Sequence, residues 1–228
     1  MTYLTSSLGE SSLIGTLAAI PLYAAIYLLF IDSKNVEHMK KVALGASMFT
    51  FVLSLGLWIL FDRSTAVFQF REYWQWIDQV NINFNLGVDG ISLFFVLLTT
   101  LLVPLCLLAS WDSIKIHVKE YLIAFLVMET MLIIVFCILD LLLFYVFFES
   151  ILIPMFLIVG IWGSRERKIR AAYLLFLYTL IGSVLMLLAI LLIYSITGTT
   201  TYTNLLTVSF DESLQKFLWL AFFASFAV

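Results

Sequence analysis

Residues 141–160, LLLFYVFFESILIPMFLIVG, determine the fold class. The segment is apolar without interruption from Leu141 to Phe148, and its single ionisable side chain is that of Glu149. A helix needs about twenty predominantly apolar residues to cross the hydrocarbon core of a bilayer. The segment therefore predicts a transmembrane helix that carries a carboxyl group inside the membrane.

The composition extends this prediction to the whole chain. Its 228 residues are 63% hydrophobic and 12% charged, with a mean hydropathy of +1.10, and a soluble domain of this size could not cover so much apolar surface. Six segments are long enough to span the membrane, near residues 13–31, 42–61, 90–110, 121–139, 141–162 and 171–194. A seventh apolar run starts at residue 217 and reaches only about 18 Å.

The expected fold class is thus an all-α, polytopic membrane helix bundle with six complete transmembrane helices and a truncated seventh. We expect residues 1–228 to form a single membrane domain, the N-terminal portion of a longer chain. Residues 62–89 hold several aromatic side chains among scattered charges, which is typical of the membrane–water interface. They predict an interfacial aromatic loop on the outer side, in which the alternation of AVFQF (66–70) allows a short hairpin.

The distribution of Lys and Arg predicts the orientation. Nine of the twelve cations lie in the loops after the first, third and fifth spans, and the other three are Arg63, Arg71 and Lys216. Since cytoplasmic loops are enriched in Lys and Arg, the N-terminus is expected outside.

Two carboxyl groups lie deep in the spans, those of Glu129 and Glu149. An acidic residue at a helix centre costs about 2.5–3.5 kcal/mol, so such a group faces the bundle interior, meets a cation or water, or stays protonated. We interpret Glu149 as a proton-relay residue and Glu129 as a second, weaker candidate. The alternative for each is a neutral acid that is hydrogen-bonded to a neighbouring helix. No Lys or Arg falls inside the six spans, so a cationic partner of Glu149 is expected after Val228.

Other residues have expected structural roles. Pro154, five residues after Glu149, predicts a helix kink because it removes a hydrogen bond to the Ser150 carbonyl. Asp140 is interpreted as a hydrated turn residue and helix cap. The small and hydroxylated residues of YTLIGSVL (178–185) predict a close helix–helix contact. No Gly-rich phosphate loop and no cluster of His or Cys indicates a cofactor or a metal, so any redox chemistry is expected in other chains.

Three blocks resemble a known family: FNLGVDGISLFFVLLTTLLVPLCLLASW (84–111), ILDLLLFYVFFESILIPMFLIVGIWGSRERKIRAAYLLFLYTLIGSVLMLLAILLIYS (138–195) and FLWLAFFASFAV (217–228). They are similar to chain 4 of NADH:ubiquinone oxidoreductase, respiratory complex I, in its plant mitochondrial form. The resemblance implies an antiporter-like, proton-translocating subunit of the inner mitochondrial membrane, with other membrane-arm subunits as partners. It places the family's essential glutamate at Glu149 and its lysine partner on a broken seventh helix.

Two alternatives remain open. A subunit of a Na⁺/H⁺ antiporter or of a membrane-bound hydrogenase would share the fold and the glutamate. An assembly or anchoring protein without a transport role would use Glu149 only for helix packing. Glu129 matches no known role in the family.

Overall fold

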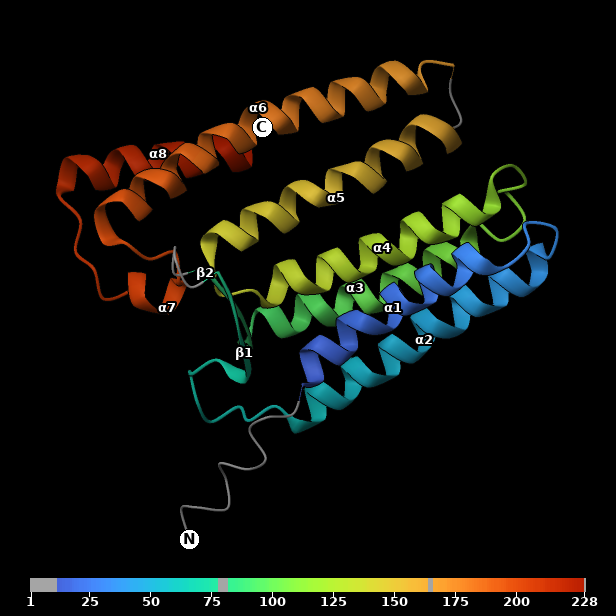
Figure 1. Ribbon diagram of the computed structural model, residues 1–228, viewed down its shortest axis with the longest axis horizontal. Helices are drawn as coiled ribbons and strands as arrows, with labels where there is room; N and C mark the ends of the chain where they lie inside the picture. Colours follow the sequence, from blue (N-terminus) through green and yellow to red (C-terminus); the bar gives the residue numbers. More distant parts are fainter. Residues whose placement is uncertain (1–11, 78–81, 164–165, 228) are drawn as a thin grey trace, which may run out of the picture. The chain divides into compact units, whose positions relative to one another are not determined.

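The computed structural model describes residues 12–77, 82–163 and 166–227, and its main elements are long apolar helices (Figure 1). Six of them are long and apolar enough to cross a membrane: α1 (Leu13–Phe30), α2 (Val36–Leu60), α3 (Ser92–Ala109), α4 (Val118–Cys137), α5 (Leu141–Trp162) and α6 (Lys168–Thr197). A short helix, α7 (Tyr202–Leu205), and a further helix, α8 (Glu212–Ala227), follow. The predicted membrane helix bundle with six spans is confirmed.

Several helices extend beyond the apolar runs that predicted them. Helix α2 begins at Val36 rather than near residue 42, and α8 begins at Glu212 rather than near residue 217. The added turns carry charged residues, whose long side chains keep their charged ends in water while the helix continues. At the start of α8, the Lys216 ammonium lies 2.6 Å from the Glu212 carboxylate, one turn apart on the exposed face.

A two-stranded sheet forms within the segment that was expected to be an aromatic loop. Strand β1 (Gln69–Ile77) pairs with β2 (Ile82–Val88), and the rings of Trp74 and Phe84 lie 6.0 Å apart between the strands. Apolar residues alternate with Asn and Gly through INFNLGV (82–88), which is the period of a strand. The hairpin therefore lies further along the chain than the alternation of AVFQF suggested.

The chain divides into two compact units, each described by itself. The first comprises residues 1–72 and 86–137 and contains α1 to α4. Helices α2 and α4 each pack against the other three helices of this unit. The second unit comprises residues 73–85 and 138–228; here α5 packs against α6, and α6 against α8.

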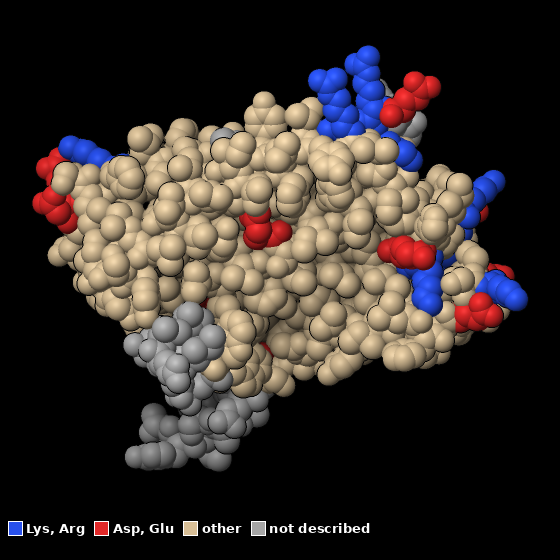
Figure 2. Space-filling model, turned by 45° about the horizontal axis from the view of Figure 1, so that its top comes forward, with Lys and Arg blue, Asp and Glu red and all other residues tan. Residues whose placement is uncertain are grey.

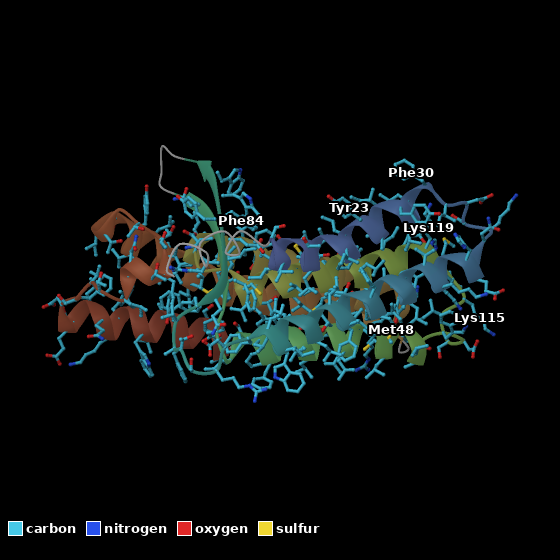
Figure 3. All side chains as sticks on the ribbon, turned by 90° about the horizontal axis from the view of Figure 1, so that it is seen from below. Tyr23, Phe30, Met48, Phe84, Lys115 and Lys119 are labelled. Atoms are coloured by element: carbon cyan, nitrogen blue, oxygen red, sulfur yellow. The ribbon has the colours of Figure 1, made fainter. Side chains whose placement is uncertain are left out.

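The outer faces of the helices are apolar. Tyr23 and Phe30 of α1 and Met48 of α2 point away from the helices (Figure 3), and Tyr23 and Phe30 are 69% and 84% exposed. On the face shown in Figure 2, Lys and Arg gather at the helix ends, and the surface between them is almost entirely free of them. Such surfaces suit lipid rather than water. The chain is a multi-pass membrane protein.

Lys119 and Lys40 each donate hydrogen bonds to backbone carbonyls at one end of the first unit, the end at which α1 ends and α4 begins. The Lys119 ammonium donates to the carbonyls of Leu29 and Ile31, at 2.7 and 2.9 Å, and Lys115 lies at the same end (Figure 3). The Lys40 ammonium donates to the Trp111 carbonyl and lies 5.4 Å from the centre of the indole ring. These bonds satisfy carbonyls that helix ends and loops leave without a partner.

Candidate functional site

Glu149 lies in α5, in the second unit. The residue is half-buried, and both of its carboxyl oxygens are buried without a hydrogen-bond partner among the described residues. Aromatic rings surround this turn of the helix: Phe148 stacks on Phe144 at 5.8 Å and meets Phe226 of α8 at 6.1 Å. None of the ion pairs found within the described ranges includes Glu149. The carboxyl group thus lies on an apolar turn of α5, next to a residue, Phe148, that makes aromatic contacts.

Aromatic contacts define which part of α6 lies level with Glu149. The Phe156 ring on α5 contacts Tyr173 and Phe176 of α6, at 5.5 and 5.8 Å between ring centres. The two helices run in opposite directions. Glu149 precedes Phe156 by seven residues on α5, so the matching position on α6 follows residues 173–176 by about seven residues. Glu149 is therefore level with Gly182 and Ser183, to within about one turn.

The small residues of YTLIGSVL, for which a close helix contact was predicted, lie at this level of α6. Gly182 and Ser183 are buried on α6, which packs against α5, and the Ser183 hydroxyl donates to the Leu180 carbonyl at 3.0 Å. A hydroxyl that donates to its own helix still offers acceptor capacity to a neighbouring proton donor. A buried hydroxyl oxygen therefore lies at about the height of the carboxyl group, and the close helix contact stays a prediction.

Pro154 lies inside α5, which continues through it to Trp162. Proline has no N–H, so the Ser150 carbonyl has no donor at this position of the helix. The Ser150 hydroxyl donates to the Val146 carbonyl at 2.7 Å and so bonds one turn further back. The Ser150 carbonyl, next to Glu149, therefore lacks its helical donor. The kink at Pro154 stays a prediction.

Asp140 caps α5, as the sequence predicted. Its carboxylate accepts from the amides of Leu142 and Leu143, at 3.0 and 3.1 Å, and from the Thr200 hydroxyl at 2.6 Å. The expectation that it is hydrated was wrong, because the residue is only 2% exposed. The segment after α6 covers it through a bridge between Asp140 and Thr201.

Glu129 lies in α4, in the first unit, and is fully buried. Neither carboxyl oxygen has a hydrogen-bond partner within the described part of the chain. The alternative of an acid hydrogen-bonded to a neighbouring helix is thus not what this structure shows for Glu129. A buried polar group without a partner is costly and is a feature of functional sites.

The buried hydroxyl groups of the first unit were not predicted from the sequence. On α2, Ser47, Thr50 and Ser54 are fully buried, whereas the exposed face of the same helix is apolar. The Ser54 hydroxyl lies 2.8 Å from that of Thr100 on α3, also fully buried. The spacing of Ser47, Thr50 and Ser54 at i, i+3 and i+7 inside an apolar span was the signal that could have identified this row.

The described residues offer no evident place for a metal. They contain no group of three or more His, Cys, Asp or Glu side chains that could hold an ion. In the second unit, an apolar hollow is lined by side chains of the hairpin and of α5, namely Trp74, Trp76, Phe84, Leu143, Val146 and Phe147. The chemistry available at Glu129 and Glu149 is proton binding by carboxyl groups in apolar surroundings.

Two family models match adjoining parts of the chain. Residues 16–139 match the model described as NADH-ubiquinone oxidoreductase chain 4, amino terminus. Residues 139–228 match the model described as NADH:quinone oxidoreductase/Mrp antiporter, TM.

Curated relatives carry the name of the first of these models. The chain is 60% identical over 208 residues to NADH-ubiquinone oxidoreductase chain 4 of Arabidopsis thaliana, which covers 91% of this chain and 42% of that protein. It is 56% identical over 244 residues to chain 4 of Prototheca wickerhamii, covering 99% and 46%. The chain therefore spans less than half the length of these relatives.

Solved structures share the arrangement of the helices. A chain of respiratory complex I from Thermus thermophilus with bound NADH superposes with a TM-score of 0.81 at 26% identity, covering 94% of this chain and 43% of that chain. A chain of an archaeal membrane-bound sulfane sulfur reductase, at 17% identity and a TM-score of 0.80, covers 95% and 44% and shows the common fold.

Proposed function

Because the chain belongs to the NADH-ubiquinone oxidoreductase chain 4 family, we propose that it is a membrane-arm subunit of a respiratory NADH:quinone oxidoreductase and contributes a proton half-channel. Its partners are the other membrane-arm subunits and the lipid bilayer. The plant and algal relatives support a location in the inner mitochondrial membrane. Electron transfer takes place in other chains of the complex.

The observation that supports this function most directly is the pair of buried, unpartnered carboxyl oxygens of Glu149. A carboxyl group in hydrocarbon binds a proton readily and releases it when a cation or water approaches. This alternation is what a proton relay requires. In the proposed half-channel Glu149 is the relay residue, and Glu129 is a second carboxyl group of lower weight.

The cationic partner of Glu149 is proposed to lie on the continuation of α8. Phe226, near the end of the described part of this helix, packs against Phe148, the residue before Glu149. The next turn of the same helix would therefore come close to the level of the carboxyl group. This proposal rests on the family resemblance together with that contact.

The orientation is proposed from the cations alone. Lys34, Lys115 and Lys119 would face the matrix, and the N-terminus would lie on the side of the intermembrane space. Proton movement towards that space costs about 2.3 kcal/mol per charge across 100 mV. Quinone reduction elsewhere in the complex would supply this free energy through coupled conformational states.

The test of this function uses the complex with its full-length chain, reconstituted in sealed vesicles and energised with NADH. A pH-sensitive dye inside the vesicles should report proton transport. We expect the rate in sodium-free buffer to equal the rate with sodium present. A proton gradient that forms only with sodium present would instead support a Na⁺/H⁺ antiporter. Wild-type transport by a complex assembled without this chain would show that the chain contributes no half-channel.

A further inference from the structure

We propose that Glu129, with the hydroxyls of Ser54 and Thr100, forms an internal water-binding and proton-loading site in the first unit, open only at the end where Lys40 lies. The site goes beyond the proposed role of Glu149 and does not depend on it. It uses only residues of α2, α3 and α4, which pack against one another.

Two contacts define the height of Glu129 in the bundle. The rings of Phe95 on α3 and Phe136 on α4 stack at 5.1 Å, and these consecutive helices run in opposite directions. Seven residues further into the bundle from these rings are Leu102 on α3 and Glu129 on α4, which are therefore at the same height. Thr100 is two residues from Leu102, so its height differs from that of Glu129 by about 3 Å. The hydrogen bond between Thr100 and Ser54 places the α2 hydroxyl at a similar height.

The direction of the Glu129 side chain follows from its helical spacing. Leu122 and Val118 precede it by two and three turns and so share its face of α4. Both line a hollow together with Lys40 of α2 and with α3 residues that include Leu107. The face of α4 that carries Glu129 is therefore directed at α2 and α3.

The same spacing aligns the partner helices. Lys40, Ser47 and Ser54 follow one another at intervals of seven residues on α2, and Thr100 precedes Leu107 by seven on α3. Residues seven apart lie on nearly the same face of a helix. The polar groups thus form a column that starts at the hollow beside Lys40 and reaches Glu129.

The hydroxyls of this column present acceptors. Those of Ser47, Thr50, Ser54 and Thr100 lie 2.7 to 3.1 Å from carbonyls three or four residues earlier in their own helices. Pro104 in α3 also leaves the Thr100 carbonyl without its helical donor. A ring of acceptors fits an O–H donor, either a water or a protonated carboxyl group, better than it fits a carboxylate.

The polar column extends further in one direction than in the other. Towards the hairpin end, Thr99 and Thr130 are buried next to Thr100 and Glu129, and beyond them the buried positions of the three helices are apolar, including Leu57, Leu93, Val96 and Ile133. Towards the other end are Ser47, Ser110, Tyr121 and Lys40. Water and protons would therefore reach Glu129 from the Lys40 end.

Few titratable groups surround the site. The buried face of α1 is apolar, consisting of Ile14, Leu17, Ala18, Pro21, Ala25 and Leu28. On the other helices of the unit, the titratable side chains nearest the column are Lys40, Tyr121, Cys106 and Cys137, and Glu72 lies at the far end, beside the start of α1. No cation of the described residues pairs with Glu129.

The loading step is a simple proton transfer. A hydronium in the column gives its proton to a Glu129 oxygen, which forms the new O–H bond, and a neutral water remains. The protonated carboxyl group can then donate to a hydroxyl or carbonyl oxygen of the column. No oxidant or reductant takes part.

The experiment is infrared difference spectroscopy of the complex with its full-length chain in sealed vesicles. The pH is stepped on one side at a time, and the carbonyl stretch of protonated carboxyl groups is recorded. We expect a band that follows the pH on the side of the loops holding Lys34 and Lys115. This band should be lost in Glu129→Gln and retained in Glu149→Gln, so that failure of the Glu149 proposal leaves it unaffected.

A second variant keeps the proposal testable if Glu129→Gln does not assemble. Combining Ser54→Ala with Thr100→Val removes acceptors but leaves the acid, and should shift the frequency of the same band, whereas Ser195→Ala at an exposed hydroxyl should not. The proposal is overturned if no band depends on these residues, if the band ignores pH, if it follows the opposite side, or if it responds to sodium instead.

Discussion

The hydroxyl oxygens of Ser54 and Thr100 lie 2.8 Å apart and join α2 to α3 across a fully buried contact. Hydroxyl bonds between membrane helices contribute on average about 0.6 kcal/mol. A double-mutant cycle of Ser54→Ala and Thr100→Val should give a coupling free energy of about this size. Unfolding of the purified chain in detergent would measure it.

The matched control for this cycle is Ser195→Ala, whose hydroxyl is exposed and bonds only within its own helix, to the Leu192 carbonyl. It should leave the free energy of unfolding nearly unchanged. Strictly additive effects of Ser54→Ala and Thr100→Val would show that the contact between α2 and α3 carries no stabilisation.

The cap of α1 predicts a pH dependence. The Glu72 carboxylate accepts from the amides of Ile14 and Gly15, at 2.7 and 3.0 Å, and so holds β1 against the start of the helix. Burial raises the pKa of Glu72 above its usual 4.5, although the amide bonds oppose this effect. The folded unit then binds more protons than the unfolded chain between pH 4.5 and the raised pKa.

The stability that Glu72 contributes should therefore be greatest below pH 4.5 and decrease as pH rises through this window. Melting temperatures in detergent, measured across the window, should show this slope in the wild type and a smaller slope in Glu72→Gln. Glu120→Gln, at an exposed position, is the control and should keep the wild-type slope. Equal slopes in wild type and Glu72→Gln would contradict the assignment.

Asp140 should be important for the stability of the second unit. It caps α5 and accepts from Thr200, so Asp140→Ala should lower the free energy of unfolding by about 1–2 kcal/mol. Asp140→Asn should keep part of this stabilisation, because the amide oxygen of Asn can still accept hydrogen bonds. Asp112→Ala, in an exposed loop, should change little. Equal stability of the alanine variants at positions 140 and 112 would show that the cap is not needed.

Much of the fold could be predicted from the sequence because a membrane helix needs only a long apolar run. The starts of α2 and α8 could not, since their charged first turns interrupt the apolar pattern on which the spans were counted. The burial of Asp140 depends on Thr200, sixty residues away, and on the path of the segment after α6.

The candidate sites were predictable to different degrees. An acid inside an apolar run is visible in the sequence, which is why Glu129 and Glu149 were identified. The hydroxyls around Glu129 were not, because Ser and Thr are common in membrane helices and only packing shows that Ser54 faces Thr100. The hairpin was displaced in the prediction because the alternation of residues 82–88 was read as part of a loop.

The orientation can be tested with two lysines. Lys34 follows α1 and Lys216 lies in α8, so five membrane helices separate them and they must face opposite sides. Both lie in exposed positions. An impermeant amine reagent applied to intact mitochondria stripped of their outer membrane should label Lys216 and not Lys34. The reverse pattern would overturn the proposed orientation.

If Glu149 carries protons, the number of protons transported per NADH oxidised should depend on its carboxyl group. The assembled complex would be compared with Glu149→Gln, with Glu149→Asp and with Glu166→Gln as an exposed control. We expect a lower ratio in Glu149→Gln, partial retention in Glu149→Asp and the wild-type ratio in Glu166→Gln. A wild-type ratio in a fully assembled Glu149→Gln complex would contradict it.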